Sequence, residues 1–173
     1  SVTDAADHKD RQAINQLHRK YPNAIIIVTG CYAQLQPEQI SQMPGVDYVL
    51  GQNEKYDIPT LVESLEKTTE KIHVSAIREV DEFHGVHSGD DRTRCFIKVQ
   101  DGCNYFCTYC TIPYARGKSR NPYIKEIVKD AEIAIQQGAK ELILTGVNIG
   151  DFGKSTGETF FELIQAIDCI SGD

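Results

Sequence analysis

The stretch from Gln100 to Arg120, QDGCNYFCTYCTIPYARGKSR, decides how the rest of this chain is organised. It places Cys103, Cys107 and Cys110 in a C-x-x-x-C-x-x-C spacing within one short loop. Thiolates this close together can surround a single iron–sulfur cluster or a metal ion. Structural zinc sites and electron-transfer clusters use four protein ligands, so a set of three leaves one position open for a substrate or cofactor.

Two other interpretations of these cysteines fit the sequence less well. A zinc site needs a fourth ligand, and no C-x-x-C or H-x-x-x-H partner stands at the expected spacing. Disulfides are disfavoured because the cysteines are crowded into one loop and nothing at the N-terminus looks secretory. The residues therefore favour a cluster with an open coordination position.

These same residues resemble a known family. The string CNYFCTYC is similar to the C-x-x-x-C-x-aromatic-C loop of radical S-adenosylmethionine (SAM) enzymes. The longer pattern D-G-C-N-x-x-C-x-Y-C-x-x-P-x-x-R-G resembles one branch, the MiaB-like methylthiotransferases. The resemblance implies that Cys103, Cys107 and Cys110 hold a [4Fe–4S] cluster. It also implies that the fourth iron binds SAM, which electron transfer cleaves to a 5′-deoxyadenosyl radical.

Composition narrows the class of protein. A chain of 173 residues suits one ordinary domain or two small ones. The net charge of -7 argues against a general nucleic-acid binder, because non-specific affinity comes from neutralising phosphates. The longest apolar run, Ala24 to Val28, is far too short to span a bilayer, so we expect no membrane association. Six cysteines without a signal peptide predict a reducing, cytoplasmic setting.

Residues 1–75 read as an α/β domain with a parallel sheet. Asp4 is predicted to cap a first helix that ends before Pro22. The β-branched run Ala24–Val28 is typical of a strand buried on both faces. The remaining predicted elements are a helix over 37–43, a strand over 46–50, a helix ending near Glu66 and a strand over 71–75. Strands that alternate with helices indicate a parallel sheet.

Cys31 lies in the turn after the first predicted strand, where open α/β sheets place ligands. On its own, such a cysteine is more often a small buried hydrophobic residue than a ligand. However, T-G-C-Y-A-Q resembles the last of three cysteines that hold an auxiliary [4Fe–4S] cluster in the same family. Residues 1–9 resemble the segment directly after its second cysteine. The resemblance thus implies a polypeptide that lacks two auxiliary ligands, and we expect it to be inactive alone.

Residues 76–93 are predicted to form an acidic linker, since apolar periodicity disappears and glycines and acidic residues are interspersed. His84 and His87 form an H-x-x-H spacing within it. Away from a helix that spacing does not aim two imidazoles at one point. Solvated loop histidines are therefore favoured over a metal pair.

Residues 94–173 read as the start of a radical SAM β/α barrel, a partial TIM-like fold. Alternation over 94–100 puts Cys95, Ile97 and Val99 on a core face, and Lys98 and Gln100 on the opposite face. That second face is either a barrel lumen or the wet face of an edge strand. The other predicted elements are a helix over 123–137 stopped by Gly138, a strand over 141–144, and a helix from Thr159 with Cys169 in its core.

Several further site residues follow from the resemblance. Tyr109 is expected beside the adenine of SAM, through its backbone. Gly146 and Asn148 match a turn that borders the amino-acid and ribose end of the cofactor, although T-G-V-N stands here where many relatives have a G-G-E-like turn. Arg116, with Lys118 and Arg120, would contact the SAM carboxylate or an RNA phosphate, or else form a solvated basic turn.

For function, the resemblance implies a methylthiotransferase that inserts sulfur from the auxiliary cluster and takes a methyl group from a second SAM. L-T-G-V-N-I-G is more similar to the branch that acts on threonylcarbamoyl-adenosine beside the tRNA anticodon than to the isopentenyl-adenosine branch. Implied partners are tRNA, SAM and an electron donor such as flavodoxin or ferredoxin. The alternatives are the same chemistry on an aspartate of a ribosomal protein, and a non-catalytic iron–sulfur or metal-binding module with a fourth protein ligand.

Overall fold

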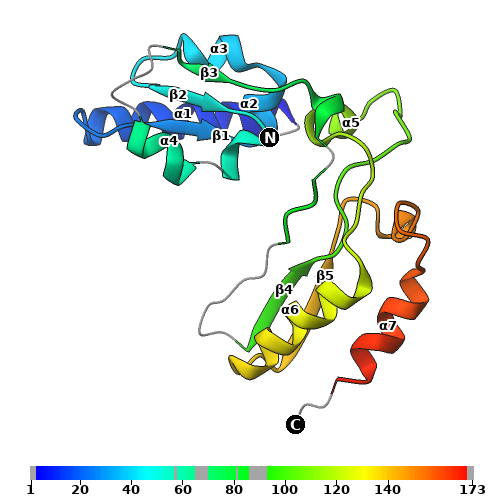
Figure 1. Ribbon diagram of the computed structural model, residues 1–173. Helices are drawn as coiled ribbons and strands as arrows, with labels where there is room; N and C mark the ends of the chain where they lie inside the picture. Colours follow the sequence, from blue (N-terminus) through cyan, green and yellow to red (C-terminus); the bar gives the residue numbers. More distant parts are fainter. Residues whose placement is uncertain (1–2, 57, 65–69, 81, 86–92, 171–173) are drawn as a thin grey trace. The chain divides into compact units, whose positions relative to one another are not determined.

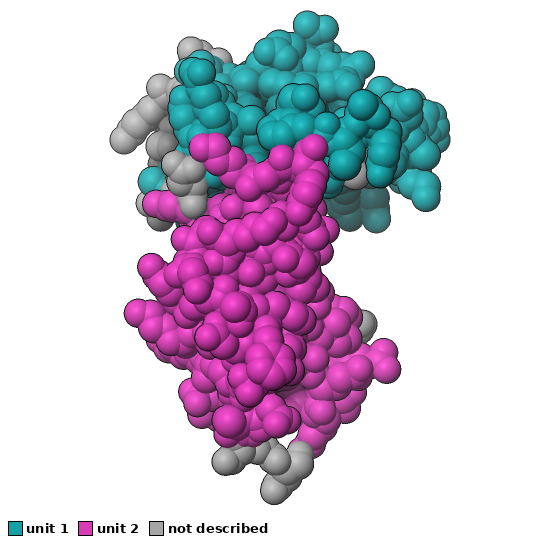
Figure 2. Space-filling view, turned by 90° about the vertical axis from the view of Figure 1, so that its right-hand side faces the viewer, with its two compact units in different colours: residues 1–80, 106–117 teal, residues 81–105, 118–173 magenta. Residues whose placement is uncertain are grey.

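Two small parallel sheets organise the chain in the computed structural model, which describes residues 3–56, 58–64, 70–80, 82–85 and 93–170 (Figure 1). Contacts between residues divide the chain into two compact units, coloured separately in Figure 2. Unit 1 comprises Ser1–Val80 and Phe106–Gly117, and unit 2 comprises Asp81–Tyr105 and Lys118–Asp173. Among the described residues, no helix combines the length and apolar character needed to cross a membrane.

Unit 1 is built on a three-stranded parallel sheet of order β1-β2-β3, which confirms the predicted α/β class. Its strands are β1 (Ile27–Thr29), β2 (Tyr48–Leu50) and β3 (Ile72–His73). The helices are α1 (Asp4–Lys20), α2 (Cys31–Leu35), α3 (Pro37–Ser41), the 3-10 turn η1 (Glu54–Tyr56) and α4 (Ile58–Ser64). The predicted end of the last helix, near Glu66, lies outside the described residues.

The core of unit 1 gathers side chains from the sheet and three helices, including Ile14 of α1, Tyr32 of α2, Ile40 of α3 and Val49 of β2. The expectation that the whole run Ala24–Val28 is a doubly buried strand was wrong. Pairing begins only at Ile27, opposite Tyr48, and Ile25 before it is 57% exposed. A β-branched run marks strand propensity, but the length of the strand depends on where its neighbour begins.

The first helix is capped one residue earlier than predicted. Thr3 has an extended backbone and its hydroxyl accepts a hydrogen bond from the N–H of Ala6 at 3.3 Å. Asp4 is instead the first helical residue, where its negative charge is favourable at the positive end of the helix dipole. Both residue types suit a helix start, so sequence alone does not separate cap from first turn.

Unit 2 contains two consecutive β/α pairs, as expected for the start of a β/α barrel. Strands β4 (Arg94–Lys98) and β5 (Glu141–Thr145) pair in parallel, with Arg94 opposite Glu141 and Lys98 opposite Thr145. Helices α6 (Ile124–Gln136) and α7 (Phe160–Asp168) pack against them. Cys95, Ile97 and Val99 are buried in this core, which confirms the predicted alternation along β4.

The ends of the unit 2 helices follow local sequence signals. Gly138 ends α6 with a φ of +96°, which favours glycine. The Thr159 hydroxyl accepts from the N–H of Glu162 at 3.2 Å, while the Glu162 carboxylate accepts from the N–H of Thr159 at 2.7 Å. This reciprocal capping box starts α7 where it was predicted. Cys169 was expected in the core, but it is exposed at the end of α7.

The predicted linker is only partly described. Residues 77–79 form a 3-10 turn, η3 (Ile77–Glu79), and Val80 after it is buried. His84 is described, but His87 lies outside the described residues, so the expectation of solvated loop histidines in place of a metal pair stays a prediction. The short helix α5 (Ile112–Arg116) belongs to unit 1, where it packs against α2 and η3.

Gln100 joins the ends of the two barrel strands. Its side-chain amide lies within hydrogen-bond distance of the carbonyl groups of Asp101 (2.9 Å) and Gly102 (2.8 Å) and of the Ser119 hydroxyl (3.0 Å). Its oxygen accepts from the N–H of Asn148 at 2.7 Å. Gln100 is only 1% exposed, so the wet-edge interpretation of this face was wrong for this residue.

We predict that Gln100→Leu destabilises the protein by about 2–4 kcal/mol, because two carbonyl groups and one N–H near the core lose their side-chain partner. The measurement is urea-induced unfolding. Gln165→Leu, the same change at an exposed position of α7, serves as the control and should shift stability by less than about 0.5 kcal/mol. Equal losses in the two variants would contradict the structural role given to Gln100.

Candidate functional site

The cysteine loop follows β4, and its two ends, at Asp101 and Arg120, are held together. Asp101 and Arg120 form an antiparallel bridge, with backbone N···O distances of 3.0 and 2.9 Å. The Asp101 carboxylate is buried and lies 3.5 Å from the Lys98 ammonium and 3.4 Å from the Arg120 guanidinium. Gly102 follows with a φ of +72°, a turn that glycine makes without strain. Charge pairing and backbone bonds thus close the loop at residues 101 and 120.

The three cysteines lie in this loop rather than in either hydrophobic core. Cys103 and Cys110 are half-buried and Cys107 is exposed, and the N–H of Cys110 donates to the carbonyl of Cys107 at 2.9 Å. Phe106 has a φ of +46°, an uncommon conformation for a residue with a side chain. The division between the units falls directly before Phe106.

The cysteine set fits an open-site iron–sulfur cluster by its chemistry. The loop contributes three thiols with solvent access, a donor set suited to iron–sulfur clusters. Within the part of the chain that the structure describes, no three His, Cys, Asp or Glu side chains are gathered in the geometry of a metal site. The ligand roles of Cys103, Cys107 and Cys110 therefore stay a prediction from spacing and residue type.

The turn after β5 has a steric reason for its glycine. A Cβ atom built at Gly146 would lie 3.1 Å from both the Cβ and the Oε1 of Gln100, so a larger residue would displace the Gln100 amide. Asn148 uses its backbone N–H for that same amide oxygen. The two residues predicted to border the cofactor thus also hold the loop after β4 against the loop after β5.

The other residues assigned from the resemblance have varied surroundings. Tyr109 is 89% exposed between Cys107 and Cys110, so its side chain is open to a ligand. Arg116 is half-buried in the last turn of α5, and Lys118 is exposed. Arg120 is not a solvated cation, because its guanidinium contacts the Asp101 carboxylate and its Nε donates to the Glu82 carbonyl at 2.9 Å.

Cys31 lies in unit 1 at the carboxyl end of β1, as expected. It begins α2 and is 8% exposed. The Gln52 amide donates toward its sulfur at 3.8 Å, while the Gln52 backbone N–H donates to the Gln34 side chain at 2.9 Å. Gln34 in turn donates to the Ser75 carbonyl at 3.0 Å. A thiol at the carboxyl end of a strand, contacted by the buried Gln52 amide, has a more polar position than a core cysteine usually occupies.

Asp151 and Lys154 have no predicted role in the sequence analysis, and the structure joins them to Tyr105 of the cysteine loop. Asp151, in the 3-10 turn η4 (Ile149–Asp151), accepts from Lys154 at 2.7 Å and from the Tyr105 hydroxyl at 3.1 Å. The bond from Lys154 holds the pKa of the Asp151 carboxyl below its ordinary value, against the opposing effect of burial, and the bond from Tyr105 adds to it. The same Asp151 contact raises the pKa of the Lys154 ammonium.

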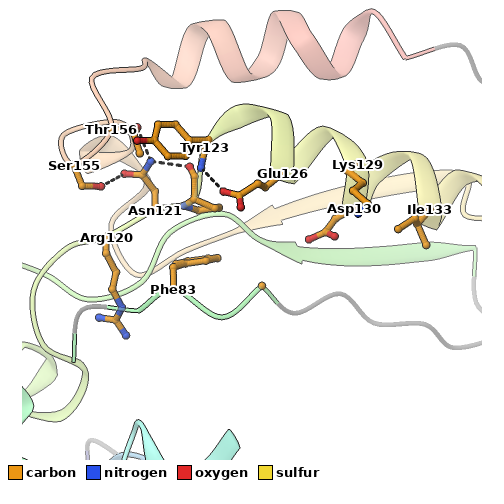
Figure 3. Close-up of a pocket in the computed structure, with 12 residues that line it drawn as sticks. Phe83, Arg120, Asn121, Tyr123, Glu126, Lys129, Asp130, Ile133, Ser155 and Thr156 are labelled. Carbon is orange, nitrogen blue, oxygen red and sulfur yellow. Dashed lines mark hydrogen bonds between the residues drawn. The ribbon is translucent and has the colours of Figure 1, made fainter. Parts of the chain in front are cut away.

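A pocket of about 700 Å³ opens beside the start of α6 (Figure 3). Its wall includes Phe83, Arg120, Tyr123 and Asp130. Asn121, also on the wall, accepts from the N–H of Gly153 at 2.9 Å and from the Ser155 hydroxyl at 2.8 Å. Of the residues that the sequence analysis singled out, Arg120 lines this pocket, whereas Cys103, Cys107, Cys110, Tyr109, Arg116, Gly146 and Asn148 are not among its lining residues.

Comparison with known proteins gives two family matches. The model of the Radical SAM superfamily matches residues 97–166, which include the cysteine loop and both turns after the strands of unit 2. The model described as "Uncharacterized protein family UPF0004" matches residues 1–51, which include Cys31.

Individual relatives agree with both matches. The chain is 39% identical to the "Threonylcarbamoyladenosine tRNA methylthiotransferase MtaB" of Aquifex aeolicus, over 99% of this chain and 43% of the relative. It is 38% identical to the protein of the same name from Bacillus subtilis, over 97% of this chain and 38% of the relative. The "tRNA-2-methylthio-N(6)-dimethylallyladenosine synthase" of Fusobacterium nucleatum is 37% identical over 86% of this chain and 35% of the relative.

The chain thus spans about two fifths of the length of the first two of these relatives. The two family models match residues 1–51 of the N-terminal α/β unit and residues 97–166 of the radical SAM segment, in the order expected from the sequence. On these grounds the chain belongs to the MiaB-like family of radical SAM methylthiotransferases, in the branch of its MtaB relatives.

Proposed function

We propose that this protein is a radical SAM methylthiotransferase that adds a methylthio group to threonylcarbamoyl-adenosine beside the anticodon of tRNA. The observation that carries the proposal is the position of the cysteine loop. It follows the first strand of a parallel β/α pair and is hydrogen-bonded through Gln100 to the turn after the second strand. Ligand sites of β/α folds lie at these carboxyl ends.

In this proposal Cys103, Cys107 and Cys110 hold a [4Fe–4S] cluster and leave one iron open to SAM. When bound, the cluster and SAM together would supply the 5′-deoxyadenosyl radical that abstracts a hydrogen atom from the substrate. The backbone of Tyr109, a residue that is 89% exposed, would lie by the adenine of SAM. Gly146 and Asn148 would border its amino-acid and ribose end, and Arg116 would meet its carboxylate.

Cys31 is assigned to a second, auxiliary [4Fe–4S] cluster, which would be the source of the inserted sulfur. Support comes from its place at the end of β1 and from the Gln52 amide that donates toward its sulfur. Hydrogen bonds to a ligand sulfur tune the potential of a cluster. Within unit 1, α5, which follows Cys110 closely, packs against the helix that Cys31 begins.

The partners proposed are tRNA, SAM and an electron donor such as flavodoxin or ferredoxin, in a reducing cytoplasm. With a net charge of -7, this chain offers little general attraction for RNA phosphates. Contact with tRNA is therefore local in this proposal. Exposed Lys118, near the end of the cysteine loop, is a candidate for such a contact, whereas Arg120 is paired with Asp101.

We predict that the protein at its full natural length, reconstituted anaerobically with iron and sulfide, gives the EPR signals of two reduced clusters. Adding SAM should shift one signal, because the amino and carboxylate groups of SAM bind the open iron. Cys107→Ala should abolish that signal and leave the other. Cys169→Ala, an exposed cysteine with no assigned role, should leave both signals unchanged.

Zinc in place of iron, or a cluster indifferent to SAM, would reject the enzyme proposal. Either result would favour a non-catalytic metal-binding module, which requires a fourth protein ligand.

Substrate choice is tested in cells. Deleting the gene should remove the methylthio form of threonylcarbamoyl-adenosine from digested tRNA, measured by liquid chromatography and mass spectrometry. Re-expression of the protein should restore it, and re-expression of Cys107→Ala should not. An unchanged tRNA profile with loss of a methylthio group from a ribosomal-protein aspartate would replace the tRNA substrate by the protein one.

A further inference from the structure

We propose that Tyr105, Asp151 and Lys154 form a clamp that positions the first half of the cysteine loop on the turn after β5. All three residues belong to unit 2, and Tyr105 lies two positions from both Cys103 and Cys107. The inference rests on the proposed function only in taking this loop as the cluster site. The clamp makes Asp151 a positioning residue, which acts on the loop through the tyrosine hydroxyl.

The geometry of the clamp is that of a closed triangle of contacts. The Tyr105 hydroxyl donates to Asp151 Oδ1 at 3.1 Å, and the Lys154 ammonium donates to the same oxygen at 2.7 Å. The ammonium also lies 3.3 Å from the Tyr105 oxygen and 5.4 Å from the centre of its ring. Tyr105 lies 46 residues before Asp151, so these contacts add a second link between the loops after β4 and β5, beside the one that Gln100 makes at their base.

Asp151 is a firm anchor because it is itself fixed and buried. It is 2% exposed, and its N–H donates to the Asn148 carbonyl at 2.9 Å. The next residue, Phe152, is part of the core between the sheet and α7. The second carboxylate oxygen, Oδ2, has no hydrogen-bond partner among the described residues. A buried carboxylate needs compensating donors, so Asp151 depends on the bonds from Tyr105 and Lys154.

Tyr105 is held in place by its hydroxyl contact and not, like a core tyrosine, by burial of its ring. Its side chain is 57% exposed, so burial of the ring does not hold it and the hydroxyl contact is its tether. The adjacent Asn104 supplies a second tether, since its side chain accepts from the N–H of Ser119 at 3.0 Å. Beyond Tyr105, the next residue is the unusual Phe106 with its positive φ. The tethers therefore restrict the arc that leads from Cys103 toward Cys107.

A restricted loop binds a cluster more firmly because less conformational entropy is lost when the thiolates are ordered. Supporting hydrogen bonds of this kind orient metal ligands and slow metal loss when they are kept. We therefore expect the clamp to control how rapidly the loop opens and how rapidly iron leaves it.

The test uses Tyr105→Phe in the protein at its full natural length, a change that keeps the ring and removes the hydroxyl. In the apoprotein, amide hydrogen exchange of the peptide covering residues 103–110 should become roughly tenfold faster, as expected for loss of a hydrogen bond to a charged group. In the reconstituted protein, iron loss to excess EDTA, followed by the cluster absorbance, should accelerate by a similar factor. Asp151→Asn should reproduce both effects, and Lys154→Arg should retain near-normal rates because it keeps the cation.

Tyr114→Phe is the matched control. Tyr114 lies in the same stretch, is also 57% exposed, and makes a ring contact with Phe106 that a phenylalanine keeps. It should leave exchange and iron loss unchanged. Exchange and iron loss in the double variant Tyr105→Phe/Asp151→Asn should be no faster than in the faster single variant, because both changes break the same contact between Tyr105 and Asp151.

Rates in Tyr105→Phe equal to those in Tyr114→Phe would overturn the clamp, and so would additive effects in the double variant. If Asp151→Asn does not fold, the tyrosine pair alone decides, since its changes are at exposed side chains. Absence of a SAM-sensitive cluster would reject the proposed function but not the clamp, because exchange in the apoprotein is measured without iron. A SAM-sensitive cluster with unchanged exchange would do the reverse.

Discussion

The buried amide of Gln100 is the interaction on which the geometry of unit 2 depends. Two strands that end side by side expose backbone groups that need partners once they are removed from water. The Gln100 side chain donates to the carbonyls of Asp101 and Gly102 in its own loop and accepts from the N–H of Asn148 in the loop after β5. Gly146 is small enough to let this amide lie there. One side chain thus holds the loop after β4 to the loop after β5.

Because these contacts hold the ends of the cysteine loop, the rest of the loop can be exposed to solvent and still keep its position relative to β4 and β5. Its ends are held by the bridge between Asp101 and Arg120, and its first half by the contacts of Tyr105 with Asp151. Cys107 between these regions is exposed. Loops that carry function are typically of this kind, with mobile ligating side chains on a rigid scaffold. The same arrangement leaves the three thiols outside the hydrophobic cores.

Unit 1 also places a cysteine at the carboxyl end of a parallel strand, with different polar residues around it. Cys31 follows β1 as Cys103 follows β4, and each stands at the carboxyl end of a parallel strand. Here the Gln52 side-chain amide donates toward the Cys31 sulfur, and the Gln52 backbone N–H donates to the side chain of Gln34. In both units, therefore, parallel pairing brings a cysteine to an edge where backbone groups and amides replace hydrophobic contacts.

The sequence by itself determined the α/β class, the helix stops such as Gly138, the burial of alternate residues along β4 and the family, since these follow from local periodicity, turn chemistry and one dense motif. Only the tertiary structure decided which residues outside the motif support it. Asp151 and Lys154 look like ordinary surface charges until β5 is paired with β4. Ile25 and Cys169 were misjudged for the same reason, because burial depends on neighbours distant in sequence, and local pattern does not contain them.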